Sequence, residues 1–297
     1  MRKYIVLTIY LLFVVCLAWA GTNNEADSTL TRHQIRIMTY NIKMLPRGAV
    51  YIHHHPVIRA RLIPDKIIAE NPEVVVFEEA FDGKAVRILH KKLKKAYPYW
   101  AGQQNRKVVS YKRAGGVLMF SKYPLKVIES IRYTQCKGID CMGNKGAMLV
   151  EVQHPAMKFE LLGTHMQAGG SVELKESQYA EAAALLKRHA QEGEPQFAAG
   201  DFNTHKGDSV LYPKLCSTLQ ALDGDITGDL KYTSDHLLND MEKPNPKKRG
   251  VIDYVFYVAN GVHFKSAERC VREFEQRWSP EHKDLSDHFA MVLTVKI

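Results

Sequence analysis

Asp201 and Asn203, near the end of the run Phe197-Ala-Ala-Gly-Asp-Phe-Asn-Thr204, are the side chains whose types and spacing point most directly to chemistry. They follow Gly200 and an apolar stretch, and they stand two positions apart. On an extended segment, residues i and i+2 point to the same side. Both groups would therefore face one point, where a metal ion, a phosphate or an attacking water could sit. A simple turn is the alternative, because Gly, Asp and Asn are turn residues.

Five other apolar runs carry polar side chains at their ends or, in one case, inside the run. Each alone has a structural explanation, since an Asn can open a turn, a His can be satisfied in a core and a buried Asp can bond nearby backbone. Together they supply oxygen ligands for a hard cation, a histidine base and polar groups for a phosphate. These are the parts of a metal-dependent phosphoester hydrolase. The side chains are Asn41, Glu78, Glu79, His165, Gln167, Asp253, Asp287 and His288.

The apolar runs predict the framework that must bring these side chains together. Helical periodicity separates some of the runs, and many short strands with few helices predict a two-sheet α/β sandwich flanked by helices. No internal repeat or Gly/Ser-rich linker divides the chain, so we expect a single catalytic domain over residues 35–297. The predicted strands are 35–40, 74–77, 116–120, 147–152, 159–164, 196–199, 252–258 and 289–295, and the predicted helices are 57–70, 84–96 and 172–191.

The first residues predict export. Arg2 and Lys3 precede an apolar run that ends in the small-x-small sequence Ala18-Trp19-Ala20. This layout is typical of a secretory signal peptide, here residues 1–20, and a polar leader over residues 21–34 follows. An uncleaved membrane anchor is the alternative, but the run is shorter than the ~20 residues that a span needs. We expect a secreted or periplasmic protein after cleavage near Ala20.

The charge balance favours an acidic partner. The net charge is +9 and the isoelectric point is about 9.2, which suits nucleic acid, an anionic membrane surface or a phosphorylated substrate. The basic runs Lys91–Lys95 and Lys247–Arg249 could bind a phosphodiester backbone or lie on an anionic bilayer. They could equally be solvated faces.

Cysteine and histidine patterns favour disulfides over a metal cluster. The mature chain keeps four cysteines, an even count with three possible connectivities. The short loop from Cys136 to Cys141 is the most natural pair, and Cys216 with Cys270 would complete the set. Four free thiols are the alternative. The run His53-His54-His55 is more typical of plain surface, because adjacent side chains cannot all converge on one ion.

Taken in order, these segments resemble the endonuclease/exonuclease/phosphatase superfamily, which includes deoxyribonuclease I, the inositol polyphosphate 5-phosphatases and the Mg²⁺-dependent sphingomyelinases. The resemblance covers roughly residues 35 to 297. It implies a deoxyribonuclease I-like, four-layered α/β sandwich, with two mixed sheets packed face to face and helices outside. The segments are Asn41, Glu79, Gly163-Thr164-His165, Gly200-Asp201-Phe202-Asn203, Ile252-Asp253-Tyr254 and Ser286-Asp287-His288.

Three segments are similar to the secreted neutral sphingomyelinase branch. They are Glu78-Glu79-Ala80-Phe81-Asp82, Gly163-Thr164-His165-Met166-Gln167-Ala168, and Asp140-Cys141-Met142-Gly143-Asn144-Lys145-Gly146. The residues after Asn203 are Thr-His, unlike the Tyr/Phe-Arg that 5-phosphatases tend to carry. One departure is the interval Cys270–Ser286, where related enzymes that attack host cells often have an aromatic-tipped hairpin. Here it holds Phe274 and Trp278 among many charges.

The resemblance implies a role for each matching residue. Glu79 would bind Mg²⁺ or another divalent cation, with Asn41 close by. His288 would be the general base, oriented by Asp253 or Asp287. Asp201, Asn203 and His165 would surround the phosphate, with protonation of the leaving group as a second possibility for His165. Gln167 and Lys145 would contact the substrate.

The resemblance implies hydrolysis of sphingomyelin to ceramide and phosphocholine by a monomer in peripheral contact with a membrane. Within the same fold, the alternatives are a secreted Mg²⁺-dependent nuclease and a phosphatase or phospholipase C that acts on another phospholipid. A catalytically inactive binding module is disfavoured, because none of the six polar positions is missing.

Overall fold

A computed structural model describes residues 33–46, 54–105 and 114–297 of the chain. The expected signal peptide, residues 1–20, and all but the last two residues of the expected leader lie outside the described residues. Within those residues, no helix has the length and apolar character that crossing a bilayer requires.

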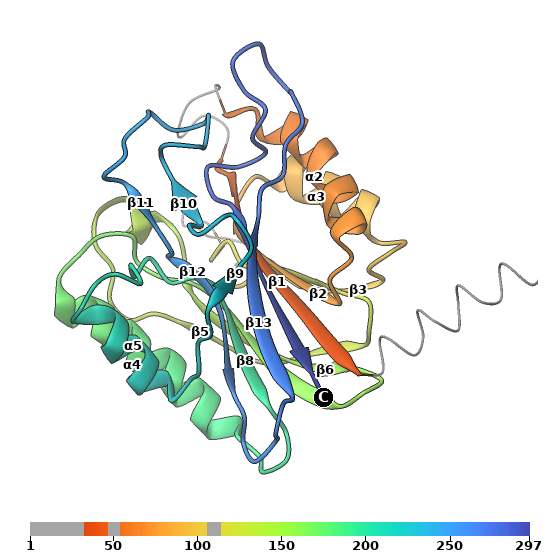
Figure 1. Cartoon of the computed structure of the whole chain (residues 1–297), viewed down its shortest axis with the longest axis vertical. Coiled ribbons are helices and arrows are strands. Elements are labelled where there is room, and N and C mark those ends of the chain that lie inside the picture. Colours follow the sequence, from red (N-terminus) through yellow and green to blue (C-terminus); the bar gives the residue numbers. More distant parts are fainter. Residues whose placement is uncertain (1–32, 47–53, 106–113) are drawn as a thin grey trace, which may run out of the picture.

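Two sheets form the centre of the molecule (Figure 1). The larger has seven strands in the order β3-β4-β2-β1-β14-β13-β9, and β1 pairs with β2 in parallel and with β14 antiparallel. Its strands are β1 (Gln34–Met44), β2 (Val74–Ala80), β3 (Tyr99–Gly102), β4 (Leu118–Ser121), β9 (Ile226–Thr227), β13 (Ser266–Arg272) and β14 (Ala290–Lys296).

The second sheet has five strands in the order β12-β8-β7-β6-β5. Strands β7 and β8 run parallel, and the other pairs are antiparallel. These strands are β5 (Leu125–Arg132), β6 (Gly146–Gln153), β7 (Lys158–His165), β8 (Gln196–Asp201) and β12 (Asp253–Val258), and a separate small ribbon joins β10 (Ser234–Asp235) to β11 (Arg249–Gly250).

Helices cover the outer faces of the two sheets. Helices α2 (Pro56–Glu70) and α3 (Gly83–Leu93) pack together on the larger sheet, and α4 (Val172–His189) and α5 (Leu211–Leu219) pack together beside the smaller one (Figure 1). Sequence marks three of the helix starts: Pro56 opens α2, while the side chains of Asp82 and Ser171 accept hydrogen bonds from the first turns of α3 and α4.

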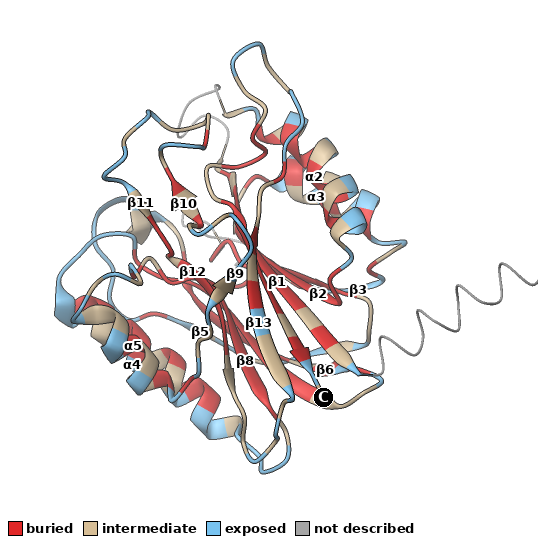
Figure 2. Cartoon of the chain, in the orientation of Figure 1, coloured by how far each residue is buried: buried red, intermediate tan, exposed pale blue. Residues whose placement is uncertain are grey.

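Strand β1 explains the layering, because both of its faces are buried. Ile35 and Ile37 point into the core between the two sheets, whereas Met38 and Tyr40 point into the core beneath α2 and α3. Figure 2 shows the same pattern, with buried residues concentrated in the central strands. The expected four-layered α/β sandwich with two mixed sheets is confirmed.

Most of the predicted elements are present, and the missed ones have weak sequence patterns. All eight predicted strands and all three predicted helices overlap observed elements. Strand β5 was not predicted, because it lies at a sheet edge and is largely exposed and rich in charge. Helix α5 was not predicted either, and Pro213 occupies its first turn. Strands β3 and β13 and the two-residue strands β9, β10 and β11 were also missed.

One of the two expected disulfides is present. Cys136 and Cys141 are bonded, whereas Cys216 and Cys270 are free. The expected Cys216–Cys270 bond is wrong, because the two thiols lie against different cores. Cys216 packs against the core between the sheets, and Cys270 packs against the core beneath α2 and α3.

Candidate active site

Strand ends from both sheets bring the predicted side chains together. In the smaller sheet, Asp201 at the end of β8 lies opposite His165 of β7 and opposite Asp253 of β12. Asn41 of β1 reaches them from the larger sheet, and its Nδ2 donates to Asp201 Oδ2 at 3.1 Å. The site is therefore assembled across the interface between the two sheets.

Close packing at Gly200 makes this assembly possible. Gly200 has a φ of +154°, and a Cβ there would lie 2.0 Å from the carbonyl oxygen of Thr164 on β7. A side chain at this position would push β8 away from β7. The glycine before Asp201 thus sets the distance between Asp201 and His165, whose Oδ2 and Nε2 atoms are 3.6 Å apart.

Asp201 and Asn203 form a small fixed unit. Asp201 Oδ1 accepts the backbone N–H of Asn203 at 2.9 Å, and Asn203 Nδ2 donates to the carbonyl of Met166 at 3.0 Å. Asn203 adopts a left-handed backbone conformation with φ +49°. Burial, reinforced by the charge of Asp253, raises the pKa of Asp201 to about 7. The pair does form a turn, but one whose side chains line the site.

Glu79 stands at the open side of the cluster. Its side chain is 22% exposed, and its Oε1 lies 4.0 Å from His165 Nε2. Its backbone is left-handed, with φ +55°. Strained conformations of this kind in non-glycine residues persist where the surrounding structure imposes them, often at functional sites. Burial and then the charge of Asp287 raise the pKa of Glu79 above its ordinary value.

His165 is a buried, neutral imidazole beside a lysine. Its Nε2 accepts a hydrogen bond from Lys145 Nζ at 3.0 Å, and its Nδ1 has no partner among the described residues. Burial, and then the charge of Lys145, hold the pKa of His165 well below its usual range. Lys145 Nζ is in turn 2.8 Å from Asp140 Oδ1.

His288 and Asp253 form a second, differently charged pair. His288 Nδ1 lies 2.9 Å from one oxygen of Asp253 and 3.1 Å from the other. Burial alone would lower the pKa of His288, but Asp253 and then Asp287 and Asp201 raise it well above its usual range. The pKa values of His165 and His288 are therefore shifted in opposite directions, because a lysine faces one and carboxylates surround the other.

The acid that orients His288 is Asp253, since Asp287 has another partner. Asp287 Oδ2 forms a 2.6 Å ion pair with Lys43 Nζ. Burial would raise the pKa of Asp287, but His288 and Lys43 lower it to about 2. Lys43 was not expected from the sequence. The only indication of a role for Lys43 in the sequence is its position between two apolar residues in a strand.

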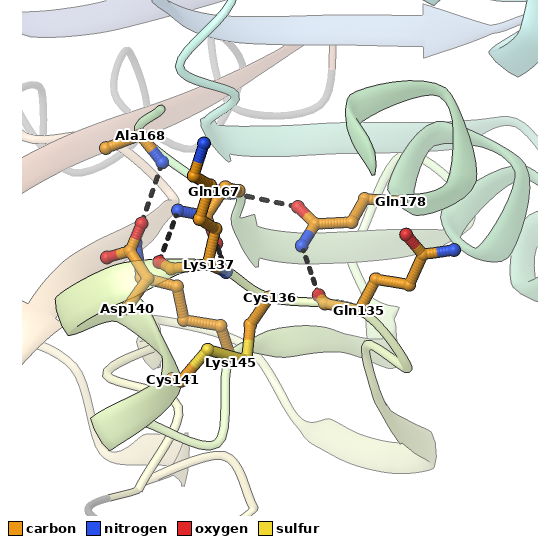
Figure 3. The surroundings of a disulfide bond; sticks show 9 residues. All are labelled: Gln135, Cys136, Lys137, Asp140, Cys141, Lys145, Gln167, Ala168 and Gln178. Atoms are coloured by element: carbon orange, nitrogen blue, oxygen red, sulfur yellow. Dashed lines mark hydrogen bonds and ion pairs between the residues drawn. A yellow bond between two sulfur atoms is a disulfide. The ribbon is translucent and has the colours of Figure 1, made fainter. Parts of the chain in front are cut away.

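The disulfide loop holds Lys145 in place (Figure 3). Asp140 lies within the loop closed by Cys136 and Cys141, and its Oδ2 accepts the backbone N–H of Ala168 at 2.9 Å. Gln167, expected to contact the substrate, is buried and uses its side-chain amide to bond both backbone groups of Lys137. In this structure Gln167 fixes the loop, and the loop's Asp140 fixes Lys145.

Arg59 of α2 is a second residue that sequence reasoning missed. It is fully buried, and its guanidinium donates to the carbonyls of Ile42, Lys43 and Leu285 at 2.6 to 2.8 Å and to that of His54 at 2.7 Å. These carbonyls belong to the end of β1, the residues just before α2 and the segment just before Asp287. One arginine therefore ties together the pieces that carry Lys43 and His288.

The donor set fits a hard divalent cation. Aspartate, glutamate and asparagine oxygens are the ligands that Mg²⁺ prefers, and burial of Glu79 and Asp201 without enough positive charge raises both pKa values. Glu78, next to Glu79, has a buried oxygen without a partner among the described residues. The side chains whose ligand atoms lie within 4.8 Å of one another are Asp201, Asp253 and His288.

Other sequence features lie outside this cluster. A further acidic group, Glu273, Glu275 and Asp284, lies on the segment between β13 and β14. In that segment Phe274 is buried, and Trp278 packs against the core beneath α2 and α3. Of the three consecutive histidines, His53 lies outside the described residues and His55 contacts the ring of Trp278. Among the parts that the structure describes, neither His54 nor His55 belongs to a group able to hold a metal.

Comparisons with known proteins agree with this geometry. Residues 38–288 match the Endonuclease/Exonuclease/phosphatase family. Sphingomyelinase C of Bacillus cereus is 27% identical over an alignment of 319 residues that covers 94% of each chain. Phospholipase C of Staphylococcus aureus is 27% identical over 311 residues, covering 92% of this chain and 91% of that protein.

Solved structures share the fold. Beta toxin from Staphylococcus aureus superposes with a TM-score of 0.78 at 24% identity, covering 87% of this chain and 99% of that one. Sphingomyelinase C from Streptomyces griseocarneus gives 0.77 at 22% identity, with 88% and 99% covered. A beta toxin mutant crystallised with bound magnesium ions gives 0.77 at 23% identity, again with 88% and 99% covered.

Proposed function

This chain belongs to the endonuclease/exonuclease/phosphatase family, and we propose that it is a secreted phosphodiesterase that hydrolyses sphingomyelin to ceramide and phosphocholine. The hydrogen bond between His288 and Asp253 carries this proposal, because it gives the cluster an oriented base beside polar groups suited to a phosphate. The relatives named sphingomyelinase C support the choice of lipid. Export follows from the signal peptide expected over residues 1–20.

His288 in its neutral form activates the attacking water. Its Nδ1–H donates a hydrogen bond to Asp253, which leaves Nε2 to take a proton from water as the oxygen bonds to phosphorus. The bond from phosphorus to the ceramide oxygen then breaks, and that oxygen takes up a proton from solvent as it leaves, while the imidazolium of His288 returns its proton to solvent. Asp253 also stabilises the imidazolium formed in this step.

The phosphate lies among Asp201, Asn203 and the His165–Lys145 pair. Lys145 Nζ supplies positive charge at the site while it donates to His165 Nε2. Because Asp201 and Asn203 are held by Asn41 and by backbone groups, they need not reorganise as charge develops. Glu79 and Asn41 are the residues that would hold Mg²⁺. When bound, the ion would neutralise a phosphate oxygen and the charge on the leaving alkoxide.

A phospholipase C that acts on a different phospholipid is the second candidate, since the relative from Staphylococcus aureus bears that name. One assay distinguishes the two lipid substrates from each other and from nucleic acid. Purified protein is incubated with Mg²⁺ and sphingomyelin, phosphatidylcholine or plasmid DNA, each with an EDTA control. Sphingomyelin is the substrate from which we expect Mg²⁺-dependent release of phosphocholine. Cleavage of DNA without lipid hydrolysis would refute the proposal.

The His288→Ala protein, purified in the same way, is the control for contaminating enzymes. Its turnover should fall by a factor of about 10³ or more, because no other group replaces the base. Its circular dichroism spectrum should match that of the wild type, since His288 is at the edge of the core. Near-normal turnover would refute the assignment of His288.

A further inference from the structure

A basic cleft lies beside the active site. It has a volume of about 540 Å³, and its lining includes Lys43, His54, His236, Glu242, Lys243 and Lys248. None of the residues expected from the sequence to act in catalysis lines it. Three lysines and two histidines face one carboxylate, so the cleft suits an anion.

Two of these lysines are available to a ligand. Lys43 is paired with Glu242 at 3.0 Å and with Asp287 at 2.6 Å, and Glu242 also lies 3.5 Å from His236 Nδ1. Lys243 and Lys248 are exposed, and neither forms an ion pair with any residue that the structure describes. The carboxylate in the cleft is therefore already engaged, while two ammonium groups remain for an incoming anion.

The loop that carries these lysines has a defined shape. Arg249 forms two 2.8 Å contacts with the carboxylate of Asp235 at its base. Backbone hydrogen bonds join His236 to Lys248 at 3.0 Å and to Asn245 at 2.9 Å. Asn239 Nδ2 donates to the carbonyl of Ser286 at 2.8 Å, which fixes the loop to the segment carrying Asp287 and His288.

The same loop presents apolar side chains to solvent. Leu237 and Leu238, directly after His236, are 46% and 48% exposed. Ile139, in the disulfide loop that fixes Lys145, is likewise 78% exposed, and Met142, directly after that loop, is 54% exposed. Exposed apolar residues beside lysines are typical of surfaces that lie in a lipid interface. A phosphodiester backbone would give the leucines nothing to contact.

We propose that this cleft binds the phosphate of an anionic phospholipid that neighbours the substrate in the bilayer. The inference deepens the proposed function and rests on it, since a second lipid is present only if the substrate is a membrane lipid. Lys243 and Lys248 contact the phosphate, and Leu237 and Leu238 enter the interface beside it. Lys43 separates the cleft from the catalytic pair, because its ammonium group bonds Asp287 directly.

Vesicle binding tests the cleft independently of turnover. The measurement is co-sedimentation of the His288→Ala protein with vesicles of sphingomyelin and phosphatidylcholine, with or without about a fifth of the lipid replaced by phosphatidylglycerol. The double substitution Lys243→Gln/Lys248→Gln should weaken binding to the anionic vesicles by about tenfold or more. The matched control, Lys126→Gln/Lys187→Gln, removes the same charge from exposed positions on β5 and α4 and should weaken it much less.

Several outcomes would overturn the inference. Equal weakening by the two double substitutions would mean that only overall charge matters. A loss of plasmid DNA binding without a loss of vesicle binding would assign the cleft to nucleic acid. Binding of glycerol 3-phosphate that depends on Lys243 and Lys248, with vesicle binding unchanged, would assign it to a free phosphate. Failure of the sphingomyelin assay is a separate result, because sedimentation requires no hydrolysis.

Discussion

Asp253 and Asp287 are two carboxylates near one imidazole, and their partners give them different roles. Asp253 accepts the proton of His288 Nδ1, whereas Asp287 is held by Lys43. Sequence order alone leaves both as candidates to orient the base. The choice depends on the register that sets Asp253 opposite Asp201 and on a lysine more than 240 positions away from Asp287.

We predict that Asp253→Asn lowers kcat by about 100-fold or more, because the neutral amide cannot stabilise the imidazolium and its NH2 group favours the wrong imidazole tautomer. Asp287→Asn should lower kcat by a smaller factor, since it loses a contact to Lys43 and leaves the His288–Asp253 bond in place. Steady-state kinetics on the same lipid vesicles compare the two. Glu281→Gln, at an exposed carboxylate on the nearby hairpin, is the control. A larger loss in Asp287→Asn would reverse the assignment.

At the scale of elements, each of these strands places a polar residue at the site because the apolar residues of the strand are buried. This is why Asn41, Glu79, His165, Asp201 and Asp253 were predictable as one group. An apolar run that meets polar residues marks the end of a buried strand, and the site collects such strand ends from both sheets. Arg59 carried no such signal, because an arginine within a helix is ordinarily solvated. Its role depends on three segments that converge only in the folded protein.

Arg59 therefore provides a test of how α2 supports the site. Arg59→Lys should lower the free energy of unfolding by about 3 kcal/mol, because a single ammonium cannot satisfy four buried carbonyls. It should also lower kcat, since those carbonyls fix the segments of Lys43 and His288. Arg61→Lys, at an exposed position on the same helix, should change stability by less than about 0.5 kcal/mol. Equal stability of the two variants in urea unfolding would contradict this role.

At the scale of the whole molecule, the pattern of strands and helices in the sequence predicted the order of the layers. It did not predict the edge strand β5 or the disulfide pairing. Strand β5 lacks a buried pattern because it borders one sheet, and the spacing of Cys216 and Cys270 carries no information about which core each thiol meets. Buried titratable groups away from the site are likewise invisible in the sequence. His154 is one of these, since burial and then the charge of Lys122 lower its pKa to about 4.

His154 predicts how the stability of the fold depends on pH. In the unfolded chain its imidazole takes up a proton near pH 6.5, whereas the folded protein resists protonation down to about pH 4. The unfolded state binds more protons in that window, so stability falls as the pH drops from about 6.5 to about 4. At about 1.4 kcal/mol per pKa unit, reduced because water partly screens the ring, we expect a contribution of about 2 kcal/mol from this residue.

Urea unfolding at several pH values checks this contribution. His154→Asn should flatten the decline between pH 6.5 and 4 relative to the wild type, because an amide cannot be protonated in that range but can still accept the N–H of Ala156. His263→Asn, at an exposed position, should leave the wild-type slope unchanged. Parallel curves for the wild type and His154→Asn would contradict the prediction.

The place of β14 in the larger sheet has a consequence for biosynthesis. The last strand of the chain lies between β1 and β13 and follows His288 by one residue. A chain that is made or threaded from its N-terminus can form β1 early, yet β1 lacks one of its two neighbours until β14 is present. Because His288 and β14 are separated by one residue, the imidazole and this strand join the fold together. A chain that ends before His288 is therefore expected to lack both the base and the strand that pairs with β1.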